Sequence, residues 1–213
     1  MWPCAAIGRA RRRSSADWVS ECAHSGRQRA TFWGRRRASP GWPTLILDES
    51  DAPGSWGEFY AAQRIDVFAR RLHDTGMLAG ADLQVLTRVI ARVAAGDFTA
   101  EQPALVRRAG HEVARLHGDL WTGNALYDGG PTGVTEIDPM AHGGHAETDL
   151  AALRVFGFPY VDQVYAGYDA VSALAARWQE RVSLHELCLV ILHAYLFGGG
   201  YLSAAVRLAS ECV

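Results

Sequence analysis

The chain has 213 residues, of which 49% are hydrophobic and 21% are charged, so it can bury a core as one domain or two small ones. Its net charge of −2 gives no whole-chain case for binding nucleic acid or an anionic membrane, and its apolar runs are shorter than a membrane span. The four cysteines lie far apart without a C-x-x-C pair, which indicates neither a disulfide framework nor a zinc site and predicts a cytoplasmic protein.

Residues 1–43 differ in composition from the rest of the chain. They carry nine arginines against two acids, Asp17 and Glu21, and show no clear helical or strand periodicity. A transit peptide and a basic arm for nucleic acid both fit the arginine content, but the prolines and the lack of support downstream count against them. We favour a third interpretation, a poorly ordered segment that is not a natural part of the fold, such as a shifted reading frame.

From residue 44 the pattern becomes that of a globular domain, which we expect to span residues 44–213. A capping box from Ser55 to Glu58 predicts a helix that ends near Asp74, and Asp82 is expected to cap a second helix. The other elements expected in this half are a strand at 44–47, a helical segment at 102–108, a strand at 113–116, and strands at 124–127 and 133–137 joined by a turn at 128–131.

Helices dominate the second half. The segment 141–145, which carries His142 and His145, is expected to be a mobile surface loop rather than a metal site. A second capping box, from Ser183 to Glu186, is expected to open a long helix. The expected helices are 147–155, 161–174, 184–197 and 201–210. This order of elements, with helices on both sides of a loop and a hairpin, predicts an α+β fold class. We expect the mainly helical C-terminal lobe of a protein-kinase-like fold.

The most informative stretch runs from His117 to Asn124. Asp119 and Asn124 have the spacing of a kinase catalytic loop, in which the Asp orients a substrate hydroxyl and the Asn binds Mg²⁺. Asp138 ends a short apolar strand, where such enzymes place a second metal-binding carboxylate. Turn and strand-end roles are the ordinary alternative for these residue types. The hairpin would bring Asn124 and Asp138 to one end, which favours phosphotransfer.

Four stretches carry a resemblance to a known family: HGDLWTGN at 117–124, EIDP at 136–139, GGHAETDLAALRVFG at 143–157 and LFGGGY at 196–201. They resemble the fructosamine kinase (ketosamine-3-kinase) family, whose relatives are the aminoglycoside phosphotransferases and choline kinases. The resemblance covers about residue 45 to the C-terminus. It implies ATP- and Mg²⁺-dependent phosphorylation of a sugar hydroxyl on a ketosamine, either a small molecule or a glycated protein side chain, as a deglycation repair.

The matching motifs imply roles for individual residues. These would be Asp119 as catalytic base, Asn124 and Asp138 as ligands of Mg²⁺-ATP, Trp121 on the sugar-binding side, and His117 and Asp149 as residues that fix the loop. For Trp121, packing against the hairpin is an equal alternative on residue type. For Asp149 the equal alternative is an acid at the start of a helix.

The chain also departs from the family. It has Ala146 where the family usually has an Arg, and all 21 of its basic residues are Arg, so it has no Lys to hold the nucleotide phosphates. No glycine-rich phosphate loop precedes residue 45 either. We therefore expect the N-terminal lobe to be missing or non-native and the kinase activity to be impaired.

Two other functions stay open. One is a non-catalytic, pseudokinase-like module that retains a sugar-binding face. The other is a metal-dependent phosphoesterase that would use His117, Asp119, Asp138 and His142.

Overall fold

The computed structural model describes residues 54–127 and 133–213, which form two compact units. The helical unit comprises residues 54–100 and 179–213, and the loop unit comprises residues 101–127 and 133–178. The Arg-rich segment 1–43, the strand at 44–47 and the turn at 128–131 lie outside the described residues and stay predictions.

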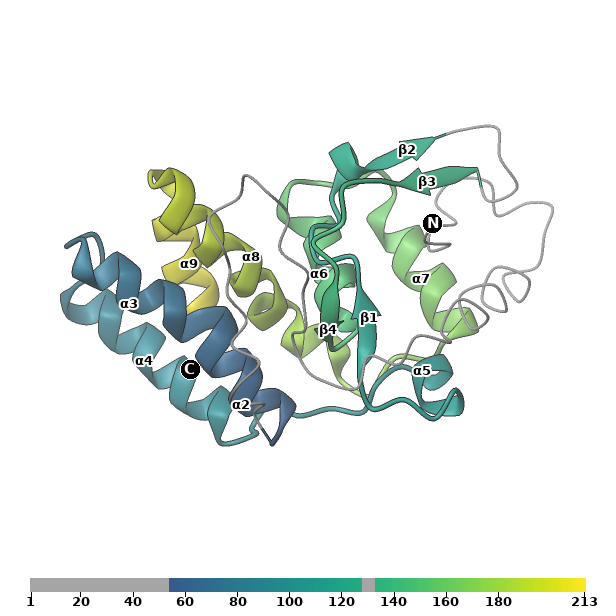
Figure 1. The fold of residues 1–213 in the computed structure, drawn as a ribbon, viewed down its shortest axis with the longest axis horizontal. Coiled ribbons are helices and arrows are strands. Elements are labelled where there is room, and N and C mark those ends of the chain that lie inside the picture. Colours follow the sequence, from purple (N-terminus) through teal and green to yellow (C-terminus); the bar gives the residue numbers. More distant parts are fainter. Residues whose placement is uncertain (1–53, 128–132) are drawn as a thin grey trace. The chain divides into compact units, whose positions relative to one another are not determined.

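The helical unit is built from two separate parts of the chain. Its elements are α2 (Trp56–Tyr60), the π-helical η1 (Ala61–Asp66), α3 (Val67–Asp74), α4 (Gly80–Ala94), α8 (Val182–Phe197) and α9 (Gly200–Ser210), with the 3₁₀ turn η3 (Trp178–Arg181) at the boundary. Within this unit α8 packs against both α3 and α9, and α4 packs against α9 (Figure 1).

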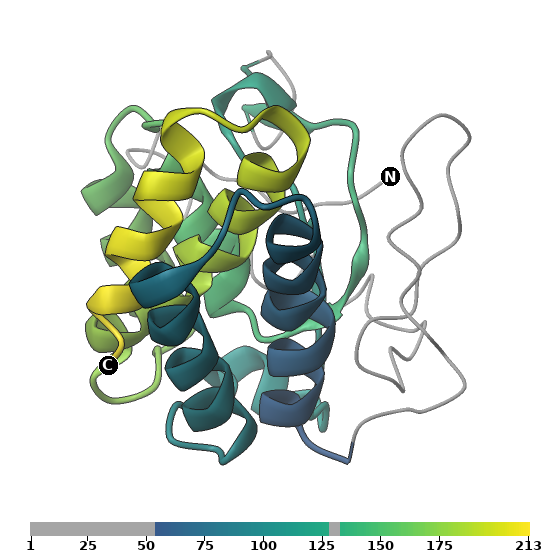
Figure 2. The same ribbon diagram turned by 90° about the vertical axis from the view of Figure 1, so that its left-hand side faces the viewer.

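The first helix begins where the sequence predicts. Ser55 Oγ accepts a hydrogen bond from the Glu58 backbone N–H at 3.2 Å, and Glu58 Oε2 accepts one from the Ser55 backbone N–H at 3.0 Å. This reciprocal capping box satisfies two N–H groups that the helix leaves unbonded. The helix continues to Asp74 as predicted, and Figure 2 shows it as one rod. The π-helical turn in its middle, which buries Arg64 and Ile65, was not predicted.

A close helix crossing fixes α2 against α4. A Cβ atom added at Gly57 would overlap the carbonyl oxygen of Val93, so the two backbones can approach this closely only with glycine at position 57. The core around this crossing is apolar. Its largest fully buried side chains in the helical unit are Phe59, Tyr60, Ile65, Phe68, Leu72, Leu78, Leu86, Leu184, Leu187 and Ile191.

Two predicted helix starts are wrong. α8 begins at Val182, so Ser183 lies inside the helix and its hydroxyl bonds to Glu211 instead of capping. α4 begins at Gly80, which places Asp82 in the first turn rather than at the cap. In both places an acid or a hydroxyl near a helix start resembles a cap in sequence, although the chain becomes helical earlier.

The loop unit contains the shorter elements. They are α5 (Ala104–Arg108), β1 (Ala114–Leu116), the 3₁₀ turn η2 (Thr122–Asn124), β2 (Ala125–Tyr127), β3 (Val134–Glu136), β4 (His142–Gly144), α6 (Glu147–Val155) and α7 (Val161–Val171). In its described residues β1 pairs antiparallel with β4, and β2 pairs antiparallel with β3 (Figure 1). The predicted helical segment at 102–108, the strand at 113–116, the hairpin strands and the helix at 147–155 are therefore confirmed.

The prediction of a mobile surface loop at 141–145 is wrong. This segment forms β4, and His142 and His145 are only 8% and 3% exposed. The glycines explain the difference, because a Cβ atom at Gly144 would overlap the Leu116 side chain on β1. Glycine thus serves here for the close approach of two strands rather than for mobility.

The core of the loop unit packs α6 and α7 against the hairpin. Its buried members are Leu120, Ala125, Val134, Leu150, Leu153, Phe158 and Tyr165. The Tyr165 hydroxyl satisfies its buried polar atom by donating to the Leu150 carbonyl at 2.6 Å. The described chain is thus mostly helical with small sheets, as predicted, and none of its helices is long and apolar enough to cross a membrane.

Candidate active site

The loop that follows β1 is held by one carboxylate. The backbone N–H of His117 donates to Asp149 Oδ2 at 2.6 Å, and that of Gly118 donates to Asp149 Oδ1 at 2.9 Å. Asp149 lies in the first turn of α6, so each of its oxygens fixes one residue of the loop. Gly118 has a φ of +81°, a conformation that favours glycine.

The environment of Asp149 acts on its ionisation in both directions. Burial raises the pKa of the Asp149 carboxyl above its usual value, and the nearby Asp119 raises it further. The bonds from Gly118 and His117 lower the pKa because they stabilise the charged form. The net shift is upward. The carboxylate is therefore stabilised mainly by two backbone N–H groups, since burial has removed much of its water.

His117 ties this loop to the segment that carries the second predicted metal ligand. Its Nε2 lies 2.9 Å from the Ile137 carbonyl, and its Nδ1 lies 3.3 Å from the Asp119 backbone N–H. A carbonyl only accepts and an N–H only donates, so the imidazole is the neutral tautomer with its proton on Nε2. The ring is 3% exposed. Both of its nitrogens are therefore engaged in holding the backbone.

Asn124 pairs directly with Asp119. Its Nδ2 donates to the Asp119 carbonyl at 2.8 Å and to Asp119 Oδ2 at 3.0 Å. Both partners are acceptors, which places the amide nitrogen toward Asp119 and the amide oxygen on the other side. Within the described residues neither Asn124 Oδ1 nor Asp119 Oδ1 accepts a hydrogen bond. Two oxygen atoms of this pair thus remain for a ligand.

The hairpin brings the residue before Asp138 into contact with Asn124. The Ile137 backbone N–H donates to the Asn124 carbonyl at 3.0 Å, one step beyond the strand pairing of Ala125 with Glu136. Asp138 follows with a φ of 50°, in the left-handed region, and its side chain is exposed. A non-glycine residue held there stores backbone strain, which is common at ligand sites. Carboxylate and amide oxygens are the hard ligands that Mg²⁺ prefers, so this set of residues fits that ion.

Trp121 presents part of its indole to solvent beside the same loop. The side chain is 38% exposed, and its ring lies edge-on to Phe156 with centroids 5.8 Å apart. A Cβ atom at Gly123 would overlap the indole, so glycine at 123 permits this rotamer. Thr122 Oγ1 donates to the Gly157 carbonyl at 2.7 Å and so ties the turn η2 to the end of α6. One edge of the indole is therefore packed and another part is exposed, and the sugar-binding role of Trp121 stays a prediction.

One buried glutamine that organises the site was missed from the sequence. Gln102 is 6% exposed, and its Nε2 donates to the carbonyls of Gly144 at 3.0 Å and Glu112 at 3.2 Å. Its Oε1 accepts from the Ala146 backbone N–H at 3.1 Å. The side chain therefore ties β4 and the start of α6 to the segment before β1. A lone Gln in a weakly helical stretch carries no signal of such a role.

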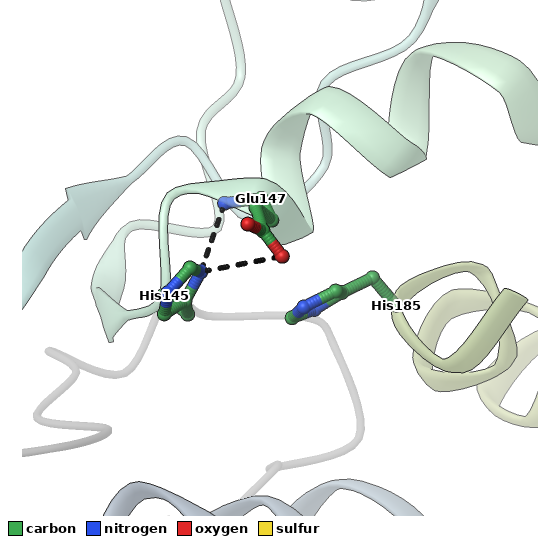
Figure 3. Close-up of side chains that lie close together, drawn as sticks. All are labelled: His145, Glu147 and His185. Atoms are coloured by element: carbon green, nitrogen blue, oxygen red, sulfur yellow. Dashed lines mark hydrogen bonds and ion pairs between the residues drawn. The ribbon is translucent and has the colours of Figure 1, made fainter. Parts of the chain in front are cut away.

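A second buried polar link lies at the start of α6 (Figure 3). The Nδ1 of His145 accepts from the Glu147 backbone N–H at 3.3 Å. Its Nε2 donates to the Glu101 carbonyl at 3.1 Å. The side chains of His145 and Glu147 are 3% and 4% exposed, and their nearest N and O atoms are 3.9 Å apart. These bonds fix the first residues of the helix that carries Asp149.

Comparison with known proteins identifies the family. The family profile described as fructosamine kinase matches residues 49–213, which is most of the chain. The chain belongs to the fructosamine kinase family. The resemblance drawn from the HGDLWTGN, EIDP and FGGGY motifs is therefore confirmed.

Two bacterial proteins are among the relatives that match this member of the fructosamine kinase family. The chain is 32% identical to a probable ketoamine kinase of Klebsiella aerogenes over 158 residues, which are 74% of this chain and 50% of the relative. It is 33% identical to a probable ketoamine kinase of Escherichia coli over 150 residues, covering 70% of this chain and 47% of the relative. The chain thus spans about half the length of the curated relatives it matches.

Solved structures agree with the family assignment. A candidate fructosamine-3-kinase of Thermobifida fusca matches with a TM-score of 0.73 and 32% identity, over 97% of this chain and 68% of that one. A candidate fructosamine-3-kinase of Haemophilus somnus matches with a TM-score of 0.60 at 19% identity, over 98% of this chain and 66% of that one, which shows a shared fold.

Proposed function

We propose that the loop unit carries the catalytic residues of an ATP- and Mg²⁺-dependent kinase that phosphorylates a sugar hydroxyl on a ketosamine. The observation that carries the proposal is the pairing of Asn124 with Asp119. The amide nitrogen orients one carboxylate oxygen, and Asp119 Oδ1 and Asn124 Oδ1 are left for a substrate hydroxyl and a metal ion. The relatives named as ketoamine and fructosamine-3-kinases support the same reaction.

Each side chain then has a defined task. Asp119 accepts the proton of the sugar hydroxyl through the carboxylate oxygen that Asn124 leaves available. Asp149 and His117 hold the backbone on either side of this carboxylate, so that it is in place before substrate arrives. The indole of Trp121 offers a flat face on which an apolar side of the sugar ring can lie.

Asn124 Oδ1 and the Asp138 carboxylate are the proposed ligands of Mg²⁺. The ion would neutralise charge on the phosphates of ATP during transfer. The strained backbone at Asp138 and its exposed side chain suit a ligand position, since neither serves the packing of the unit.

The sequence contains no Lys, and we expect this to lower the rate of phosphotransfer. Kinases with this loop hold the nucleotide α- and β-phosphates with a Lys, and this chain has none. We therefore keep the expectation that the 213-residue chain turns over far more slowly than the 1–100 s⁻¹ that is typical of kinases, by about a hundredfold or more.

The test is transfer of labelled γ-phosphate from ATP to Nε-fructosyl-lysine with the chain in excess over the sugar. Slow, Mg²⁺-dependent formation of phosphorylated product is expected, and Asp119→Asn should reduce it by about 10²–10⁴-fold because the base is lost. Asp162→Asn is the matched control, since Asp162 is an exposed acid in the first turn of α7. It should leave the rate within about twofold.

Other outcomes would favour the alternatives. Binding of fructosyl-lysine without any transfer would contradict the proposal and indicate a pseudokinase-like module. Hydrolysis of a simple phosphate ester without nucleotide would indicate a phosphoesterase. Both ring nitrogens of His117 already bond to the backbone, so a phosphoesterase metal site would have to break one of these bonds.

A further inference from the structure

His142 lies against the loop that carries the proposed catalytic base. On β4 it pairs in register with Leu116, the last residue of β1, and its side chain is 8% exposed. A Cβ atom added at Gly118 would lie 2.7 Å from His142 Nδ1 and 2.8 Å from Cε1. The imidazole therefore covers the Cα of Gly118, the residue directly before Asp119.

The same ring also holds the segment that carries the proposed metal ligand. His142 Nδ1 lies 2.9 Å from the Met140 carbonyl oxygen, which only accepts, so Nδ1 carries the proton. Met140 is two residues beyond Asp138. Its carbonyl would also be overlapped by a Cβ atom at Gly118. Gly118, Met140 and the His142 ring are thus in mutual contact.

Two imidazoles link the segment that carries Asp119 to the segment that carries Asp138. One imidazole lies on each segment and contacts the other. His117, on the base-bearing loop, donates to the carbonyl of Ile137 just before Asp138. His142, beyond Asp138, packs on Gly118 just before Asp119. The distance between the two acids is therefore constrained from both sides.

We propose that His142 is a positioning residue that fixes the distance between Asp119 and Asp138. It does so through its Nδ1–H bond to Met140 and its contact with Gly118. The inference rests on the proposed function, in which these two acids act on the substrate and the metal. His142 does not touch substrate or metal in this role. It acts through the backbone of the two segments that bear them.

The chain offers a matched pair of variants. In His142→Asn the amide nitrogen takes the place of Nδ1 and can still donate to Met140. In His142→Gln the amide nitrogen takes the place of Nε2, one bond further out, and cannot make the same bond. The two variants have the same chemistry and differ in the position of the donor, so a comparison between them does not depend on whether His142→Ala folds.

The first measurement is hydrogen exchange of the full chain without ligand. Exchange at the amides of His117 and Gly118, which donate to Asp149, should be about tenfold faster in His142→Gln than in the wild-type chain. In His142→Asn it should stay within about threefold of wild type. Equal protection in both variants would overturn the proposal, whatever the reaction of the protein.

The second measurement is Mn²⁺ binding, followed by the electron paramagnetic resonance signal of the free ion. Residues that orient a metal ligand typically change affinity by 10–100-fold when they are replaced. His142→Gln should weaken Mn²⁺ binding by about 10–100-fold at an unchanged melting temperature. His142→Asn should keep most of the wild-type Mn²⁺ affinity. A role in packing alone would lower the melting temperature of both variants and leave the ratio of their Mn²⁺ affinities near one, which would also overturn the proposal.

The two measurements separate the two hypotheses. If the wild-type chain binds no Mn²⁺ while hydrogen exchange differs between the Asn and Gln variants, the metal role in the proposed function fails and the positioning by His142 holds. If the wild-type chain binds Mn²⁺ and both variants bind it equally, the proposed function is untouched and the role of His142 is wrong.

Discussion

The two units of this protein are stabilised by different interactions. The helical unit consists of long helices around fully buried apolar side chains such as Phe59, Phe68 and Ile191. The loop unit has strands of three residues, and its described geometry depends on side chains that bond to the backbone, including Gln102, His117 and Asp149. Apolar packing contributes most of the free energy of folding but does not orient individual groups. Hydrogen bonds orient the groups they join and add only about 0.5–1.5 kcal/mol each. The predicted catalytic residues all lie in the unit that is organised by hydrogen bonds.

This contrast predicts different responses to mutation. A lost apolar contact should reduce the free energy of unfolding of the helical unit. A lost polar contact should loosen the backbone near Asp119 with a smaller effect on global stability. Four experiments test the contrast, beginning with the largest expected effect.

Phe68→Ala should destabilise the helical unit by about 3–5 kcal/mol, since it removes a ring that is 1% exposed and packs against Tyr195. Urea unfolding followed by far-UV circular dichroism measures the loss. Phe197→Ala is the control, because Phe197 is 63% exposed and its removal should cost less than about 1 kcal/mol. Equal losses for the two variants would contradict the core assignment.

Asp149→Asn should cost about 2–3 kcal/mol locally and abolish most of the phosphotransfer. The amide can accept one of the two N–H bonds at 2.6 and 2.9 Å, but it turns a donor toward the other. Amide exchange at Gly118 should rise, while Asp162→Asn, which changes an exposed acid in the first turn of α7, should leave it unchanged. Wild-type protection in Asp149→Asn would show that the carboxylate does not hold the loop.

Gly57→Ala should destabilise the helical unit by about 1–3 kcal/mol, since the new methyl group would overlap the Val93 backbone oxygen. Gly167→Ala, in α7, meets nothing within 4 Å and should instead stabilise the loop unit by about 0.4–1 kcal/mol. Opposite signs in thermal unfolding are the expected result, and two stabilised variants would show that α2 and α4 do not cross closely.

Raising the pH above 9 should destabilise the helical unit. Burial is the main cause that raises the pKa of the Cys212 thiol, to about 11, and Glu211 adds to the shift. The unfolded chain therefore releases this proton near pH 9 while the folded chain keeps it, so stability falls as pH rises, by about 1 kcal/mol between pH 9 and 10. Burial also raises the pKa values of Tyr60 and Cys188, which act in the same direction.

Cys212→Ser is the control for the pH experiment, because serine does not titrate in this range. In this variant the unfolding free energy should fall less steeply between pH 9 and 10, by about 1 kcal/mol per pH unit, because up to one fewer proton is released on unfolding. An unchanged slope would mean that the thiol is not buried as the structure places it.

The sequence predicted best what depends on neighbours along the chain. The capping box at Ser55 and the hairpin that places Asn124 beside Ile137 are local patterns, and both are confirmed. The same type of pattern at Ser183 was misleading, because the hydroxyl finds Glu211 on another helix. Local spacing cannot distinguish a cap from a residue whose partner is remote.

The features that were missed depend on contacts between distant residues. Gln102 bonds to Gly144, 42 residues later, and nothing near it in sequence indicates this. β4 was mistaken for a loop because its glycines suggest mobility, whereas Gly144 is required by the Leu116 side chain across the strand pair. Burial of His142 and His145 follows from that pairing and could not be predicted without it.

The bonds around the catalytic loop also have a kinetic consequence. The contacts of His117 with Ile137 and Asp149 close segments of 20 and 32 residues, whereas Tyr60 in the helical unit bonds to Leu184 across 124. Closing the longest segment costs about 1.2–1.6 kcal/mol more in chain entropy than closing either of the shorter ones. During folding, the loop around Asp119 should therefore form before the two parts of the helical unit meet, and a pulse-labelling experiment would detect its amides as protected first.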